Sequence, residues 1–249
     1  MLEKIPLATI LVSYVAMLFS LSVHEASHAA AAYYLEDDTA KRLGRLTLNP
    51  IAHIDLLGTV ILPLIGMFTG FRVLGWAKPV PVDPRNLTRK FRQRVAMAMV
   101  AGAGPGSNLV LSMIFLPILA LIIRLGFPAE IREQIFYATM GLPVEKFLGS
   151  EQFSVLEVFC MTMLGRLVII NVGLAIFNLL PVGPLDGGSI LRGFLPWRWL
   201  PTFDRIQPTI SIILLVMFLL GFIGFILGPL FWVADTFYIR PFARLILGV

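Results

Sequence analysis

Apolar residues occur along the chain in five long runs that are separated by short polar stretches. The runs cover roughly residues 5–35, 56–75, 95–123, 155–181 and 206–233. Each run reaches the ~20 residues that a helix needs to cross ~30 Å of hydrocarbon, and none alternates between apolar and polar positions as a barrel strand would. The pattern predicts an all-α polytopic membrane protein with about four to six transmembrane helices.

The composition and charge agree with this prediction. Of the 249 residues, 57% are hydrophobic and 14% are charged, whereas soluble proteins have about 25% charged residues. The formal net charge is +5. In a membrane protein an excess of Lys and Arg usually reflects which loops face the cytoplasm, so we expect no nucleic-acid partner. Cys160 is the single cysteine, which excludes a disulfide framework and a thiolate metal site. Any metal must be held by histidines and carboxylates.

Two features set the region between the first two core helices apart. The run 56–75 contains Pro63 and several glycines, which indicates a broken or re-entrant segment. Residues 75–82 alternate and are punctuated by proline, as in an edge strand, and residues 45–48 are a candidate pairing partner. We therefore expect a short β or re-entrant element here.

The strongest chemical signal is His24-Glu25-Ala26-Ser27-His28. On a helix, two histidines four residues apart share one face, and the glutamate between them can reach water at a metal that both bind. The alternative is a pair of hydrogen-bonded polar residues at a helix end. Unpaired, these groups would cost several kcal/mol near the end of an apolar helix, so the pattern favours a metal site.

A catalytic zinc ion takes three protein ligands and a water, so a third donor is required. The four glutamates of the polar loop 124–152 have nothing to bring them to the histidines, and His53 is one possible ligand. Asp186 is the better candidate, because it follows a proline that ends a helix and precedes two glycines that permit a tight turn.

These motifs resemble the site-2 protease family of intramembrane zinc metalloproteases, peptidase family M50, in its small bacterial and archaeal form without a PDZ or CBS domain. The resemblance runs from about residue 20 to 192 and departs from the family at Leu57 and Gly183, where prolines are common. It implies one protease domain over 1–249, with a core of about 5–205 and an additional helix and tail at 206–249. Further matching segments are Leu48-Asn49-Pro50, Gly75 to Pro81, Ala103-Gly104-Pro105 with Asn108, Asn178 to Pro181, and Leu185 to Gly188.

The ligands also constrain the topology. To bind one zinc ion (one per chain), the two histidines and Asp186 must lie at the same depth, so the helices that precede them must point the same way. An odd number of crossings must then separate these helices, and we expect that segment 56–75 does not cross. Four spans remain, with the N-terminus outside. Residues 36–94 carry ten Lys and Arg and residues 124–152 carry three, which places the active site toward the cytoplasmic side of the cell membrane.

The implied reaction is peptide-bond hydrolysis by a zinc metalloendopeptidase (EC 3.4.24.-), with Glu25 as general base. The expected partners are a membrane protein or peptide substrate, the lipid bilayer and a possible second copy of the chain. The substrate would be held unwound at the strand-like segments 45–48 and 75–82 or at the non-crossing segment 56–75. Asn108 and Asn178 are candidates for contacts to substrate or to water at the metal, or alternatively for helix-to-helix bonds. We interpret His53 as a supporting or structural residue. The alternatives are a catalytically silent relative and a metal-binding transporter or scaffold.

Overall fold

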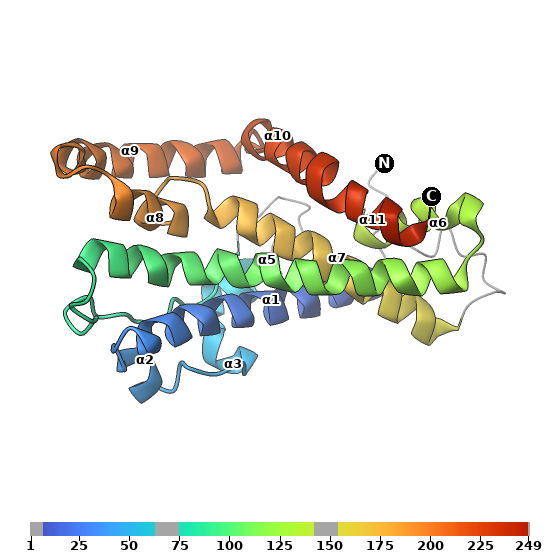
Figure 1. Ribbon diagram of the computed structural model, residues 1–249, viewed down its shortest axis with the longest axis horizontal. Coiled ribbons are helices and arrows are strands. Elements are labelled where there is room, and N and C mark those ends of the chain that lie inside the picture. The colour runs from blue at the N-terminus through green and yellow to red at the C-terminus, as the bar shows by residue number, and fades with distance from the viewer. Residues whose placement is uncertain (1–6, 63–74, 142–153, 249) are drawn as a thin grey trace. The chain divides into compact units, whose positions relative to one another are not determined.

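The computed structural model describes residues 7–62, 75–141 and 154–248 (Figure 1), and this part of the chain contains helices and no strand. Most of the long helices coincide with apolar runs of the sequence. The elements are α1 (Leu7–Tyr34), α2 (Thr39–Arg42), α3 (Pro50–His53), η1 (Leu56–Ile61), α5 (Gln93–Gly126), α6 (Ala129–Gly141), α7 (Val155–Asn178), α8 (Asp186–Phe194), η3 (Trp197–Trp199), α9 (Leu200–Leu219), α10 (Gly224–Ala234), η4 (Asp235–Ile239) and α11 (Arg240–Leu247).

Among the described residues, four helical stretches are long and apolar enough to cross a membrane. They are Thr9–Tyr34, Gln93–Gly126, Leu156–Asn178 and Trp197–Leu219. They overlap with four of the five apolar runs, so an all-α architecture with four candidate spans is confirmed for the described residues. The fifth run, 56–75, begins with the short helix η1 and continues into residues 63–74, which lie outside the described residues. Whether it crosses or re-enters stays a prediction.

The predicted β element is wrong for residues 45–48 and 75–82, which contain no strand. Two prolines in the second segment lack an N–H group and cannot donate to a ladder. The carbonyls of Lys78 and Pro79 are instead bound by the Nη2 atom of Arg45, at 2.5 and 3.3 Å. A buried guanidinium thus takes the acceptors that backbone pairing would have used.

The last apolar run is also not one helix. α9 ends at Leu219 and α10 begins at Gly224, and between them Gly221 has a φ of +80°. Side chains other than glycine rarely adopt this left-handed conformation, so Gly221 ends the first helix with a turn. The run 206–233, predicted as a single helix, therefore forms two. The polar loop 124–152 also contains a helix, α6.

The chain folds into two compact units, which we describe separately. Unit 1 contains Met1–Ser20, Leu109–Gly173 and Leu230–Val249. In this unit α11 packs against α6 (Figure 1), and two arginines bind its last carbonyls. Arg124 donates to the carbonyl of Ile246 at 2.9 Å, and Arg132 donates to that of Leu247 at 2.8 Å. These bonds satisfy carbonyls that the end of a helix leaves without partners.

Unit 2 contains Leu21–Asn108 and Leu174–Pro229, and it carries all of the predicted site residues. The single-domain expectation for 1–249 stays a prediction. A small apolar core in unit 2 joins the end of α1 to the start of α5, and its buried members are Ala32, Leu35, Leu87, Ala96 and Val100.

Beside this core, the buried carboxylate of Asp37 links the end of α1 to the chain before α5. It accepts hydrogen bonds from the Thr39 backbone and hydroxyl at 3.0 and 2.5 Å, from Asp83 N at 2.8 Å and from Asn86 Nδ2 at 3.4 Å. Burial opposes ionisation, but these bonds outweigh it and lower the pKa of Asp37 below its ordinary value.

Replacing Asp37 by Asn is expected to reduce the free energy of unfolding by about 1–3 kcal/mol at neutral pH, because a donor would then face Asp83 N. Since the folded pKa is lowered, this stabilisation is present above the unfolded pKa of ~4 and disappears as the pH falls through the folded value. Thermal unfolding of detergent-purified protein across this pH range measures both effects. Asp38→Asn, at a half-exposed carboxylate paired with Arg42, is the control, and equal losses in the two variants would contradict the prediction.

Candidate metal centre

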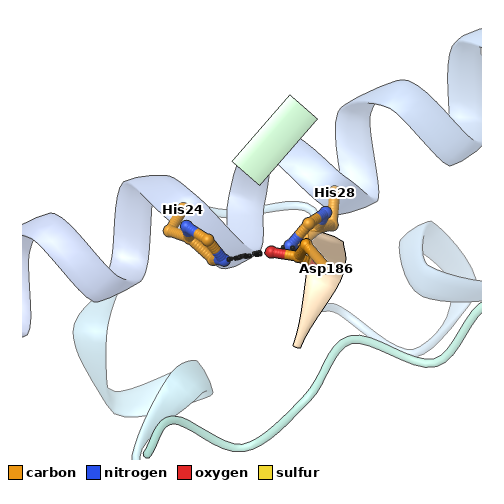
Figure 2. A group of neighbouring side chains, drawn as sticks. All are labelled: His24, His28 and Asp186. Carbon is orange, nitrogen blue, oxygen red and sulfur yellow. Dashed lines mark hydrogen bonds and ion pairs between the residues drawn. The ribbon is translucent and has the colours of Figure 1, made fainter. Parts of the chain in front are cut away.

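His24 and His28 lie one turn apart near the C-terminal end of α1, and both are buried. Figure 2 shows their imidazoles turned toward the carboxylate of Asp186, the first residue of α8. His24 Nε2 lies 3.2 Å from Asp186 Oδ2, His28 Nε2 lies 3.4 Å from Oδ1, and the two Nε2 atoms are 3.1 Å apart. The three residues predicted as metal ligands are therefore together, although 157 residues lie between His28 and Asp186 in the sequence.

The other nitrogen of each ring fixes its tautomer. His24 Nδ1 lies 2.6 Å from the Oδ1 atom of Asn108, and His28 Nδ1 lies 2.8 Å from the carbonyl oxygen of Val100. Both oxygens only accept hydrogen bonds, so Nδ1 must carry the proton in each ring. In a neutral ring Nε2 then has a free lone pair. Both lone pairs are directed toward the same space as the Asp186 carboxylate.

This cluster fits a divalent cation. Three electron-rich atoms at such distances repel one another unless a positive charge lies among them, and Asp186 Oδ2 is buried without a hydrogen-bond donor. Tetrahedral zinc with bonds of ~2.0–2.2 Å places its ligand atoms about 3.3 Å or slightly more apart. The observed separations lie close to this value, and nitrogen and carboxylate oxygen are ligands that zinc accepts. His24, His28 and Asp186 could thus hold a metal ion.

A glycine of α5 makes room for both rings. A Cβ atom built on Gly104 would overlap His28 Nε2, and it would lie 2.5 Å from His28 Cε1 and 2.7 Å from His24 Cε1. Cβ atoms essentially never lie this close to another heavy atom that is not bonded to them. Any side chain at this position would displace the imidazoles, so the close approach of α5 depends on glycine.

The two glycines after Asp186 allow the first turn of α8 to lie close to the backbone that precedes it. A Cβ on Gly187 would overlap the carbonyl oxygen of Leu180, and one on Gly188 would lie 2.7 Å from Gly183 N. Neither glycine has a positive φ, so close backbone approach is the reason for them. This close approach brings the first turn of α8, and with it the Asp186 carboxylate, against the backbone of residues 179–183.

Glu25 is oriented by the extended segment 75–82. Its Oε2 atom accepts a hydrogen bond from Val80 N at 3.0 Å. The N–H groups of Trp76 and Lys78 are also engaged, with the carbonyls of Gly58 and His53 at 3.3 and 2.9 Å. The prolines of this segment have no N–H group and cannot donate to a substrate strand. The substrate-holding role of 75–82 stays a prediction.

The remaining predicted residues differ in their placement. Asn108 belongs to the site through its bond to His24. Asn178 instead donates to the carbonyl of Leu174 in its own helix at 3.0 Å, and His53 Nε2 lies 2.8 Å from the carbonyl oxygen of Thr47. Neither Asn178 nor His53 is part of the metal group.

The sequence analysis assigned no role at the site to three residues that support it. Val100 and Val80 act through backbone atoms, which leave no trace in the choice of side chain. Gly104 could have been found from the sequence, because it lies four residues before Asn108 and therefore on the same face of α5.

Comparison with known proteins confirms the resemblance. The sequence profile of the family described as Peptidase family M50 matches residues 12–221. The chain belongs to peptidase family M50. A relative from Bacillus subtilis (strain 168), named "Putative zinc metalloprotease YwhC", is 32% identical over 225 residues, which are 90% of this chain and 88% of the relative. No solved structure matches the chain. Together with the four apolar helices, membership of M50 identifies a membrane protein of a metalloprotease family.

Proposed function

We propose that this chain is an intramembrane zinc metalloendopeptidase that hydrolyses peptide bonds within or near transmembrane segments of membrane proteins. The observation that carries the proposal is the convergence of His24, His28 and Asp186 at 3.1–3.4 Å. The carboxylate of Glu25, which follows His24 in α1, is available as a base. Membership of M50 and the name of the Bacillus relative support it. A metal-binding transporter would have no need of that carboxylate.

Each residue has a distinct role in this proposal. His24, His28 and Asp186 would hold the zinc ion, while Asn108 and the Val100 carbonyl keep both rings in the ligating tautomer. A bound zinc ion supplies Lewis acidity, which activates water for attack and polarises the scissile carbonyl. Glu25 takes the proton of the attacking water and passes it to the leaving amine. The Val80 N–H holds the Glu25 carboxylate in place.

The position of these residues supports proteolysis inside the membrane. His24, Glu25 and His28 belong to the candidate span Thr9–Tyr34, and Gly104 and Asn108 belong to Gln93–Gly126. The site would then lie within the hydrocarbon, close to the end of α1. The ten Lys and Arg of residues 36–94, which follow this end, favour the cytoplasmic side of the cell membrane.

The proposal is tested with the full chain, purified in detergent and incubated with a synthetic transmembrane peptide. We expect cleavage that a zinc chelator abolishes and added zinc restores, and mass spectrometry should locate the cut within or beside the apolar segment. A soluble peptide is the control and should be cleaved much more slowly. Cleavage that resists chelation, or zinc binding with no cleavage of any membrane peptide, would count against the proposal.

A further inference from the structure

The polar face of α9 is the feature that the proposed reaction does not yet use. Asp204, Gln207 and Ser211 are spaced i, i+3 and i+7, so they lie on one side of the helix. All three side chains bind α8 or the turn that precedes it, and α8 lies beside α9 in Figure 1. α8 begins with Asp186, so this face of α9 contacts the element that presents the third ligand.

Gln207 and Ser211 contact the turn 181–183, which lies just before α8. The Oε1 atom of Gln207 accepts a hydrogen bond from Gly183 N at 2.6 Å, and its Nε2 atom donates to the carbonyl of Pro181 at 3.3 Å. The hydroxyl of Ser211 lies within hydrogen-bonding distance of the carbonyl oxygens of Gly183 and Gln207, and it can donate its single proton to that of Gly183. One side-chain amide and one hydroxyl therefore bind both ends of the turn 181–183.

The rest of α9 makes little contact within its unit. No residue of this helix is buried, and large apolar side chains remain open, such as Ile212 at 62% and Leu219 at 68% exposure. From Ile212 to Leu220 every residue is apolar, which suits a surface that faces lipid. Polar side chains in a span are costly unless they are bonded. Gln207 and Ser211 have such bonds, to the turn before Asp186.

The turn is directly connected to Asp186. Leu185 N donates to the carbonyl of Val182 at 2.9 Å, and Gly188 N donates to that of Leu185 at 3.1 Å. These bonds carry the position of residues 181–183 into the first turn of α8. The far end of α8 is fixed separately, because Arg94 of α5 donates to the carbonyl of Leu195 at 2.7 Å. The contacts of Gln207 and Ser211 thus act at the end of α8 that carries Asp186, whereas Asp204 binds Arg192 near its other end.

We propose that Gln207 and Ser211 are positioning residues that set the place of the Asp186 carboxylate relative to His24 and His28. The last candidate span thereby determines how well the third ligand fits the metal. This inference rests on the proposed role of Asp186 as a zinc ligand.

The test measures metal binding by the full chain in detergent, independently of proteolysis. Gln207→Leu removes both bonds at nearly constant volume, and we expect zinc affinity, from competition with a chromophoric chelator, to fall about tenfold. The visible absorption of the Co²⁺-loaded protein should shift, because the carboxylate no longer lies in its native place. Ser211→Ala should act in the same direction. Gln207→Glu keeps an acceptor for Gly183 N and should recover most of the affinity.

Thr209→Val, a polar-to-apolar change at an exposed position of the same helix, is the matched control and should bind zinc like the native chain. Native affinity and an unchanged Co²⁺ spectrum in both Gln207→Leu and Ser211→Ala would overturn the positioning role alone. If Gln207→Leu does not fold, Ser211→Ala decides by the same two measurements. A native chain that binds neither metal would instead overturn the proposed function, and the positioning role with it.

Discussion

Replacing Glu25 by Gln is expected to lower the rate of peptide cleavage by about 10²–10⁴-fold while zinc binding is retained. Glutamine has the same shape but cannot take a proton from the attacking water. Its side-chain oxygen can still accept the hydrogen bond from Val80 N, which Glu25 accepts at 3.0 Å, so the geometry of the site should be preserved. Initial rates with a transmembrane peptide and zinc content by elemental analysis measure the two effects on one sample.

Glu36→Gln is the matched control for this prediction. It makes the same chemical change just beyond the end of α1, at a glutamate whose ion pair with Lys90 is long at 3.8 Å, and it should leave cleavage unchanged. If Glu25→Gln cleaves as fast as the native chain, Glu25 is not the general base. A chain that binds zinc and cleaves no membrane peptide, with or without Glu25, would point to a silent relative or a transporter.

The metal ligands could be predicted from the sequence because each one depends on local rules. The spacing of His24 and His28 places both rings on one helix face wherever the helix packs. Asp186 follows a helix-ending proline and precedes two glycines, and such a sequence can present a side chain at the end of a span. What the sequence could not supply is the support of the site by Val100 and Val80, because backbone atoms are available at every residue.

The fold shows the same division between local and long-range information. Length and hydropathy identify the spans, because every residue of a run contributes to the signal. The alternation at residues 75–82 predicted a strand and failed, since pairing also requires donors and a partner strand. Prolines remove some of the donors, and the Arg45 side chain binds the carbonyls of Lys78 and Pro79. A side chain more than thirty residues away along the chain cannot be inferred from the alternation itself.

Gly104→Ala is expected to reduce zinc affinity by about 100-fold and to reduce cleavage with it. The added methyl group would lie 2.5 Å from His28 Cε1 and 2.7 Å from His24 Cε1, well inside the contact distance of carbon atoms. Because both rings are also bound at Nδ1, neither can move away without losing its bond to Asn108 or Val100. One methyl group therefore disturbs two ligands at once. Zinc affinity by chelator competition and cleavage of a transmembrane peptide measure the result.

Two other glycines of α5 provide controls that differ only in position. A Cβ atom on Gly102 or Gly106 meets nothing within 4 Å, and alanine is favoured over glycine in a helix by up to ~1 kcal/mol. Gly102→Ala and Gly106→Ala should therefore retain zinc and cleavage, with equal or slightly higher thermal stability. If all three variants lose zinc together, the effect belongs to the helix as a whole, whereas loss in Gly104→Ala alone identifies the contact with the two imidazoles as its cause.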